Sequence, residues 1–251
     1  MLLLLWNFIL YKPLLNALVF LTSIAPAHDV GIAVVLLTIV VKLILFPLTK
    51  KSIINQAKMK NIEGEVAKIK AETPDKTEQA KKTFELYKAN KVNPFSSCLV
   101  VLIQFPIIIA LYQTFKNGLD QYPELLYSFV HYPEHIRTFF LGFIDITKHS
   151  LLLAILAGVT QFIQAHLSFS STAPSVPVSK DASFSAQLGQ SMQFQIKYLL
   201  PPFIAFIGYT VSAAIVLYWV TSNIVSIIQE VIIRKKAGLL DTKALFKFRN
   251  K

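Results

Sequence analysis

Cysteine is almost absent from this sequence, since Cys98 is the only one among 251 residues. A single cysteine excludes an intrachain disulfide and a cysteine-based metal cluster, and its apolar surroundings favour a packing role. The chain also lacks an internal repeat, which counts against transporters built from inverted repeats. It has no carboxylate dyad, no complete serine–lysine nucleophile set and no H-E-x-x-H zinc helix. The sequence therefore predicts no metal, no cofactor and no catalysis.

Charged residues are also scarce, at 16% of the chain against 54% hydrophobic residues and a mean hydropathy of +0.53. A soluble domain of ordinary composition has about a quarter charged residues. Several apolar stretches reach the length of about 20 residues that a transmembrane helix needs. The alternating pattern of a membrane β-barrel is absent. The predicted class is an all-α polytopic membrane protein.

Acidic residues are fewer than basic ones, with 14 acidic against 25 basic residues, and the net charge is therefore +11. The excess positive charge gathers in residues 50–93 and in the C-terminal tail. The positive-inside rule assigns both segments to the cytoplasm, so the residues before Val30 lie outside. Five spans agree with this parity. The expected topology has the N-terminus outside and the C-terminus in the cytoplasm.

The predicted fold is a five-span helical bundle with a cytoplasmic helical hairpin and an outer interfacial amphipathic helix. Its segments are an outer interfacial segment (1–27), the first span (28–49), the cytoplasmic hairpin (50–93), the second span (94–116), an extracellular loop (117–149), the third span (150–168), a cytoplasmic loop (169–195), the fourth span (196–211), the fifth span (212–234) and a basic cytoplasmic tail (235–251). Within the hairpin, Thr73 is the expected N-cap of the second helix and Pro74 its first residue. Pro47 is expected to mark the exit from the first span.

The N-terminal 24 residues have three readings. A signal peptide would place its cleavage site at Ala25-Pro26-Ala27, but a basic n-region is missing and Lys12-Pro13 splits the apolar core. An amphipathic helix in the outer interface fits this pattern better. A full additional span is the third alternative.

Lys42 interrupts an otherwise apolar run, at a cost of about 2.5–3.5 kcal/mol on insertion scales. It lies twelve residues beyond Val30, about 18 Å along a helix and thus in the cytoplasmic half of the bilayer. One alternative is snorkelling to the inner headgroups. However, side chains tilt toward the N-terminus of their helix, which here starts outside. The stem is therefore directed into the membrane, and a hydrated cavity is the favoured explanation.

Other predicted spans bring polar groups to the same level. The expected lining of the cavity is Lys42, Gln104, Gln161, Gln164, Trp219, Ser222, Asn223 and Ser226. The last four share one helical face with Gln229 and Glu230. Interhelical hydrogen bonding in a dry bundle is the simpler alternative for each group alone. Glu230 is expected to pair with Arg234, four residues later, rather than with Lys42.

Three stretches resemble, in order and spacing, the YidC/Oxa-type membrane protein insertases: TIVVKLILFPLTKKS, LYKANKVNPFSSCLVVLIQFPIIIALYQTF and LYWVTSNIVSIIQE. The resemblance implies the five-span fold with its hairpin, and a hydrophilic groove open to the cytoplasm and to lipid but closed outside. It gives Lys42 the role of the basic groove residue that receives polar or acidic parts of a substrate. Most members have arginine there; lysine keeps the charge but lacks the bidentate fork.

The function that follows is that of a non-catalytic insertase and chaperone, which passes hydrophilic substrate segments through the groove and releases their transmembrane helices into lipid. The expected partners are nascent membrane proteins, membrane lipids and the ribosome, with the Sec translocon as a further candidate and a monomer as the functional unit. The tail and the hairpin are the expected ribosome contacts. The residues assigned to ribosome or lipid contact are Arg234, Lys235, Lys236, Lys243, Lys247 and Arg249.

Three other classes of function compete with this prediction. A membrane-embedded enzyme needs a paired catalytic constellation, which the sequence does not offer. A small transporter or channel needs a pathway open in turn to both sides, and the outer halves of the spans offer little polar lining. A lipid scramblase using the same groove is compatible with the sequence.

Overall fold

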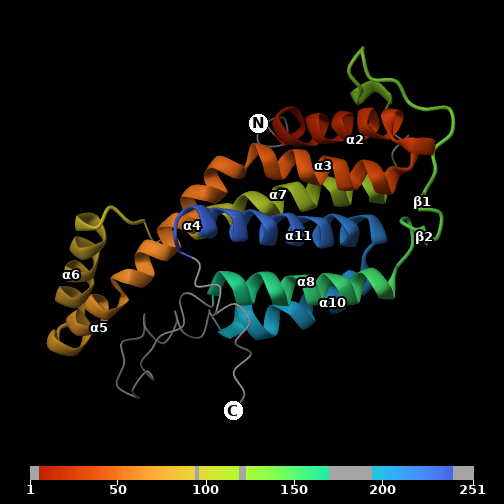
Figure 1. The fold of residues 1–251 in the computed structure, drawn as a ribbon. Coiled ribbons are helices and arrows are strands. Elements are labelled where there is room, and N and C mark those ends of the chain that lie inside the picture. The colour runs from red at the N-terminus through yellow and green to blue at the C-terminus, as the bar shows by residue number, and fades with distance from the viewer. Residues whose placement is uncertain (1–5, 94–95, 119–122, 170–193, 240–251) are drawn as a thin grey trace. The chain divides into compact units, whose positions relative to one another are not determined.

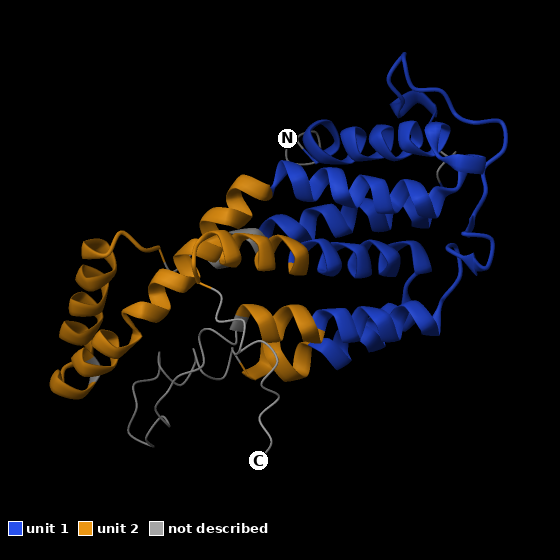
Figure 2. Cartoon of the chain, in the orientation of Figure 1, with its two compact units in different colours: residues 1–45, 101–161, 201–226 blue, residues 46–100, 162–200, 227–251 orange. Residues whose placement is uncertain are grey.

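Two compact units make up the chain in the computed structural model, which describes residues 6–93, 96–118, 123–169 and 194–239 (Figure 1). Unit 1 comprises residues 1–45, 101–161 and 201–226 (Figure 2). Unit 2 comprises residues 46–100, 162–200 and 227–251. In the described ranges both units are built from helices, apart from one short β-hairpin in unit 1.

Unit 1 is a set of apolar helices joined by one long loop. Its elements are η1 (Asn7–Tyr11), α2 (Lys12–Ile24), η2 (Pro26–His28), α3 (Val30–Ile44), η3 (Pro123–Leu125), β1 (Phe139–Phe140), β2 (Ile144–Asp145), α10 (Leu200–Thr210) and the parts of α7 (Ser96–Asn117), α8 (Leu151–Phe169) and α11 (Ala213–Lys236) that fall within the unit. Helix α2 packs along α3 (Figure 1). Burial of its leucines supplies the hydrophobic contact between them.

Three helical stretches among the described residues are long and apolar enough to cross a membrane: Asn7–Ile24, Leu151–Ser168 and Ala213–Lys236. Helix α3 and helix α4 (Phe46–Asn61) add a fourth if the pair counts as one span. The all-helical class of membrane protein is thus confirmed, with three or four candidate spans, and the five-span count stays a prediction.

The first predicted span differs in detail from the helix observed. Helix α3 ends at Ile44, and α4 begins at Phe46 after a break at Leu45. Pro47, the expected exit from the span, instead lies in the first turn of α4, which continues to Asn61. Proline is tolerated there because the first-turn N–H groups have no partner within the helix.

The loop that follows η3 is fastened to α2 by the side chain of Asn16. Its Nδ2 donates to the Leu125 carbonyl at 2.9 Å, and its Oδ1 accepts from the Tyr127 N–H at 2.6 Å. The buried side-chain amide therefore uses both its donor and its acceptor on the backbone of this loop. The interfacial position of α2 stays a prediction, because η1 and α2 together (Asn7–Ile24) also have the length and composition of a span.

Unit 2 contains α4, α5 (Glu63–Glu72), α6 (Lys76–Ala89), η4 (Gln195–Leu199), the start of α7 and the ends of α8 and α11. Helices α5 and α6 pack against each other. The N-cap of α6 is Asp75, whose carboxylate accepts from the Thr77 N–H at 2.7 Å, so the prediction of Thr73 was wrong. Thr73 instead caps the end of α5, and its buried hydroxyl accepts from Lys82 Nζ at 3.3 Å. An ionised carboxylate is the stronger acceptor for first-turn N–H groups.

The loop of residues 137–148 connects the starts of two helices in unit 1. The Val30 N–H, at the start of α3, donates to the Arg137 carbonyl at 3.0 Å. The Ala213 N–H, at the start of α11, donates to the Lys148 carbonyl at 2.7 Å. Backbone carbonyls of one loop thus satisfy first-turn donors that lack intrahelical partners. This loop, which contains the β1–β2 hairpin, therefore holds the first turns of α3 and α11 through backbone hydrogen bonds.

Gly31 provides the space for the hairpin to pack on α3. A Cβ at this position would lie 2.5–2.7 Å from three side-chain atoms of Phe140, including its own Cβ. We therefore expect Gly31→Ala to destabilise the protein by about 1–3 kcal/mol through overpacking. Thermal unfolding in detergent measures the effect as a lower midpoint. Gly64→Ala is the matched control, because nothing lies within 4 Å of its Cβ position. It should leave the midpoint unchanged or raise it, since alanine favours the helix; an equal midpoint for both variants would contradict the packing account.

Candidate functional site

Lys42 lies in the last turn of α3 and is only 8% exposed. Its Nζ donates to Ser226 Oγ of α11 at 2.9 Å, and both residues belong to unit 1. A side chain that is buried and bonded to a neighbouring helix does not agree with the snorkelling alternative. A cation in a last turn also interacts favourably with the helix dipole.

Helix α11 meets two more helices of unit 1 through polar side chains. Asn223 Nδ2 donates to Thr160 Oγ1 of α8 at 3.2 Å. Gln104 Nε2 of α7 donates to the Tyr218 hydroxyl of α11. The contacts of Ser226, Asn223 and Tyr218 thus join α11 to α3, α8 and α7 respectively. Such interhelical hydrogen bonds are worth about 1 kcal/mol each within a membrane.

The start of α11 is buried and apolar. Every residue from Ala213 to Tyr218 is buried. Helix α10 reaches this region through Gly208, because a Cβ there would be 3.5 Å from Val216 Cγ1. Helix α11 is therefore the central helix of unit 1, with contacts to α3, α7, α8 and α10.

The structure places most of the predicted cavity residues in unit 1 and one of them in unit 2. Ser222 is buried and Trp219 is half-buried on α11, near Asn223 and Ser226 in sequence. Gln161 is half-buried on α8 in unit 1. Gln164 belongs to unit 2, so the structure does not join it to the Lys42 site.

Two polar partners in this site were not predicted from the sequence. Thr160 precedes Gln161, and Tyr218 precedes Trp219, so each is one position away from a predicted residue. A shift of one residue turns a side chain by about 100° around a helix with 3.6 residues per turn. The hydroxyl groups of Thr160 and Tyr218 were visible in the sequence beside the predicted positions. Which side chain of a helix faces its neighbour depends on how the two helices pack, and a local sequence pattern does not specify this.

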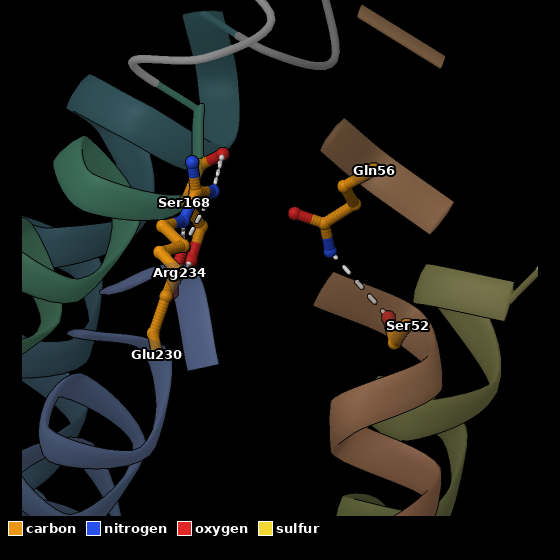
Figure 3. Close-up of polar contacts among 5 residues, drawn as sticks. All are labelled: Ser52, Gln56, Ser168, Glu230 and Arg234. Carbon is orange, nitrogen blue, oxygen red and sulfur yellow. Dashed lines mark hydrogen bonds and ion pairs between the residues drawn. The ribbon is translucent and has the colours of Figure 1, made fainter. Parts of the chain in front are cut away.

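A second polar cluster lies in unit 2 and joins the ends of α8 and α11 (Figure 3). Arg234 Nη2 lies 2.7 Å from Glu230 Oε1, and Arg234 Nε donates to the same oxygen at 2.9 Å. Ser168 Oγ donates to Glu230 Oε2 at 2.6 Å. The predicted pairing of Glu230 with Arg234 is thus confirmed, and Ser168 is an additional member. We call Ser168, Glu230 and Arg234 the terminal latch.

The terminal latch also satisfies the end of α8. Arg234 Nη2 donates to the Ser168 carbonyl at 3.5 Å, and this carbonyl is among the last four of α8, which lack intrahelical donors. The side chains of both ions are only 4% exposed. Figure 3 also shows a separate contact within α4, in which Gln56 Nε2 donates to Ser52 Oγ at 3.5 Å.

Burial of Arg234 separates it from the basic tail residues with which it was predicted to act. Lys235 and Lys236 are exposed at the end of α11. Lys243, Lys247 and Arg249 lie outside the described residues, as does the side chain of Cys98. In the part of the chain that the structure describes, no three His, Cys, Asp or Glu side chains are grouped to hold a metal ion.

The fold and the site together define the class of this protein. It is a helical membrane protein in which a buried lysine is hydrogen-bonded to the central helix of unit 1. Residues 20–239 match the family described as "60Kd inner membrane protein". The chain belongs to this family, since the match covers most of its length. Family and apolar helices together identify a multi-pass protein of the bacterial inner membrane.

Similar proteins include several named "Membrane protein insertase YidC". The one from Clostridium tetani is 30% identical over 223 residues, which are 86% of this chain and 87% of that protein. The one from Francisella philomiragia is 32% identical over 208 residues, 82% of this chain and 32% of that protein. The one from Actinobacillus pleuropneumoniae is 31% identical over 245 residues, 95% of this chain and 39% of that protein. The chain thus spans most of the first relative and about a third of the length of the other two.

Proposed function

We propose that this protein is a non-catalytic membrane protein insertase and chaperone. Its substrates are nascent membrane proteins, whose hydrophilic segments enter a groove open to the cytoplasm and whose transmembrane helices leave into lipid. The observation that carries the proposal is the buried Lys42 ammonium held by Ser226 on α11. The names of the similar proteins support the same function.

Lys42 attracts acidic residues in the short segment that the substrate sends across. The Ser226 hydroxyl is one acceptor of this ammonium, and a hydroxyl is a neutral group. Exchanging a neutral acceptor for a substrate carboxylate gives a stronger, charge-assisted hydrogen bond. Gln104, Ser222 and Asn223 add polar groups along the proposed groove.

The groove lowers the cost of moving a hydrophilic segment through hydrocarbon, because that segment meets water and polar side chains after part of the bilayer. The apolar span of the substrate then partitions sideways into lipid. Burial of apolar surface drives this step at about 25 cal/mol per Å². Polar contacts admit the substrate, and the hydrophobic effect releases it.

The proposed topology has five spans, an outer N-terminus and a cytoplasmic C-terminus, with α5 and α6 in the cytoplasm. The lysines of these two helices and of the tail support it through the positive-inside rule. A cysteine introduced by Lys88→Cys in a Cys98→Ser background should react with an impermeant maleimide only from the cytoplasmic side. Reaction from the outer side would overturn the orientation.

The proposed ribosome contact is formed by the exposed Lys235 and Lys236, by the tail beyond them and by the α5–α6 pair. The Sec translocon is a further candidate partner. The proposed functional unit is a monomer. Truncation after Lys236 is expected to weaken co-sedimentation with ribosomes, because the tail lysines and arginine no longer meet RNA phosphates. The loss should be greatest at low salt. Unchanged co-sedimentation would remove the tail from this role and leave it to topology and anionic lipid.

The decisive experiment is reconstitution of the purified protein into liposomes with a single-span substrate that bears acidic residues in its outer segment. Protease protection should show insertion in liposomes with the protein and little in liposomes without it. Equal insertion in both would reject the proposal. Ion leakage or lipid flipping without insertion would instead favour a channel or a scramblase.

A further inference from the structure

The β1–β2 hairpin carries three large apolar side chains that are exposed, one in β1 and two in the turn. Phe139, Leu141 and Phe143 are 45%, 59% and 67% exposed. Phe140, between them, packs inward against Gly31. Side chains of successive strand residues alternate between two faces, so the pairing of β1 with β2 fixes this division.

The exposed turn is held rigidly by the start of α3. The Leu141 N–H donates to Asp29 Oδ2 at 2.9 Å, while Asp29 Oδ1 accepts from the Ile32 N–H at 3.1 Å and so caps the helix. Leu141 and Gly142 have φ angles of 52° and 87°, in the left-handed region. A leucine in this conformation is uncommon and needs support from its surroundings. The buried Asp29 supplies that support, so the exposure of the turn is a fixed feature.

Charges near the hairpin are arranged unevenly. Arg137 Nη2 lies 3.6 Å from the Cβ position of Gly142, beside the apolar turn. At the end of the strands away from the turn, Lys148 Nζ pairs with Asp145 Oδ2 of β2 at 3.3 Å. The hydrogen bond from the Thr147 hydroxyl holds the pKa of Asp145 below its usual range, so this carboxylate is ionised at neutral pH. The hairpin thus has an apolar turn with one adjacent cation, and a polar base.

We propose that the β1–β2 turn is a membrane anchor that inserts into the lipid interface, with Leu141 and Phe143 among the upper acyl chains and Arg137 at the phosphates. The occupant is lipid because α8, a candidate membrane span, begins at Leu151, six residues after the end of the hairpin, and its first two leucines, Leu151 and Leu152, are 61% and 57% exposed. Aromatic side chains and arginine are the residues that favour this region of a bilayer. The proposal depends on the membrane location alone and is independent of the insertase function.

The anchor has a structural consequence for unit 1. The same loop accepts hydrogen bonds from the first turns of α3 and α11. Insertion of the turn would therefore fix the depth of these two helix starts relative to the headgroups. Because Lys42 lies near the other end of α3, the anchor would also set the level of its ammonium within the bilayer.

The single native cysteine makes the test direct. In a Cys98→Ser background, Phe143→Cys carries a nitroxide label, and the protein is reconstituted in vesicles of phosphatidylcholine and phosphatidylglycerol. Spin-label relaxation then measures collisions with oxygen, which concentrates in lipid, and with a nickel complex, which stays in water. Lys148→Cys is the matched control, since its side chain is 78% exposed in the same loop.

We expect an oxygen-to-nickel accessibility ratio several-fold higher at position 143 than at position 148. Equal ratios, with nickel dominant at both, would overturn the proposal. Shielding of position 143 from both reagents would also overturn it, because a protein surface such as a second copy would then cover the turn. Leu141→Cys provides a second site if Phe143→Cys lowers the thermal midpoint, and the same outcomes decide the result there.

Discussion

Reversing the charge at position 42 is expected to block insertion of a substrate with an acidic outer segment. A carboxylate about 4 Å from an ammonium gains about 4 kcal/mol at an effective dielectric constant of about 20, and a second carboxylate in its place repels instead. Competition from water in a groove reduces this figure. We expect Lys42→Glu to lower the inserted fraction at least about tenfold, equivalent to about 1.4 kcal/mol. Lys42→Ala should have an intermediate effect, and Lys42→Arg should retain activity because arginine keeps the charge.

Two controls separate the charge of Lys42 from a general effect on folding. A substrate whose acidic outer residues are replaced by amides should be inserted similarly by the parent and by Lys42→Glu. Lys88→Glu makes an equal change of charge on the exposed surface of α6 and should have little effect in an assay without ribosomes. If Lys42→Ala and Lys42→Glu both insert the acidic substrate as well as the parent does, the role of the charge is wrong for that substrate.

The largest expected effect on stability comes from removing the arginine of the terminal latch. Arg234→Ala leaves the carboxylate of Glu230 buried without its cation, and it removes a donor from the last turn of α8. Breaking a buried ion pair by deleting one partner costs about 3–5 kcal/mol. In a chain of this size the thermal midpoint should fall by about 10 °C. Thermal unfolding of the detergent-purified protein measures the change.

The matched control is the adjacent exposed lysine. Lys235→Ala should change the free energy of unfolding by no more than about 0.5 kcal/mol, because exposed substitutions remove little packing. Adding Glu230→Gln to Arg234→Ala should restore part of the loss, since the orphaned charge is then removed. Equal midpoints for Arg234→Ala and Lys235→Ala would contradict the latch.

Local sequence patterns predicted the features that depend on one helix alone. Apolar length predicted the membrane helices, and four-residue spacing predicted the pairing of Glu230 with Arg234. The presence of polar residues on several predicted spans favoured a position for Lys42 inside the bundle, and the residue is buried there. Where two local groups compete, the pattern was less reliable: Asp75 caps α6 in place of Thr73, because the carboxylate is the better acceptor.

Features that depend on the rotation of one helix against another could not be predicted. Thr160 and Tyr218 each lie one position from a predicted site residue, and their partners are 63 and 114 residues away in the chain. Ser168 joins the terminal latch from 62 residues away. No single-sequence pattern specifies which side chains meet across such separations.

Helix α11 contacts α3, α7, α8 and α10, yet it is the last of these helices to leave the ribosome. Synthesis runs from the N-terminus, so the Lys42 ammonium and the amide of Gln104 enter the bilayer before their partners Ser226 and Tyr218 exist. The Lys42–Ser226 and Gln104–Tyr218 hydrogen bonds thus form only after α11 has been made. Completion of unit 1 therefore depends on the correct placement of one helix that is made late.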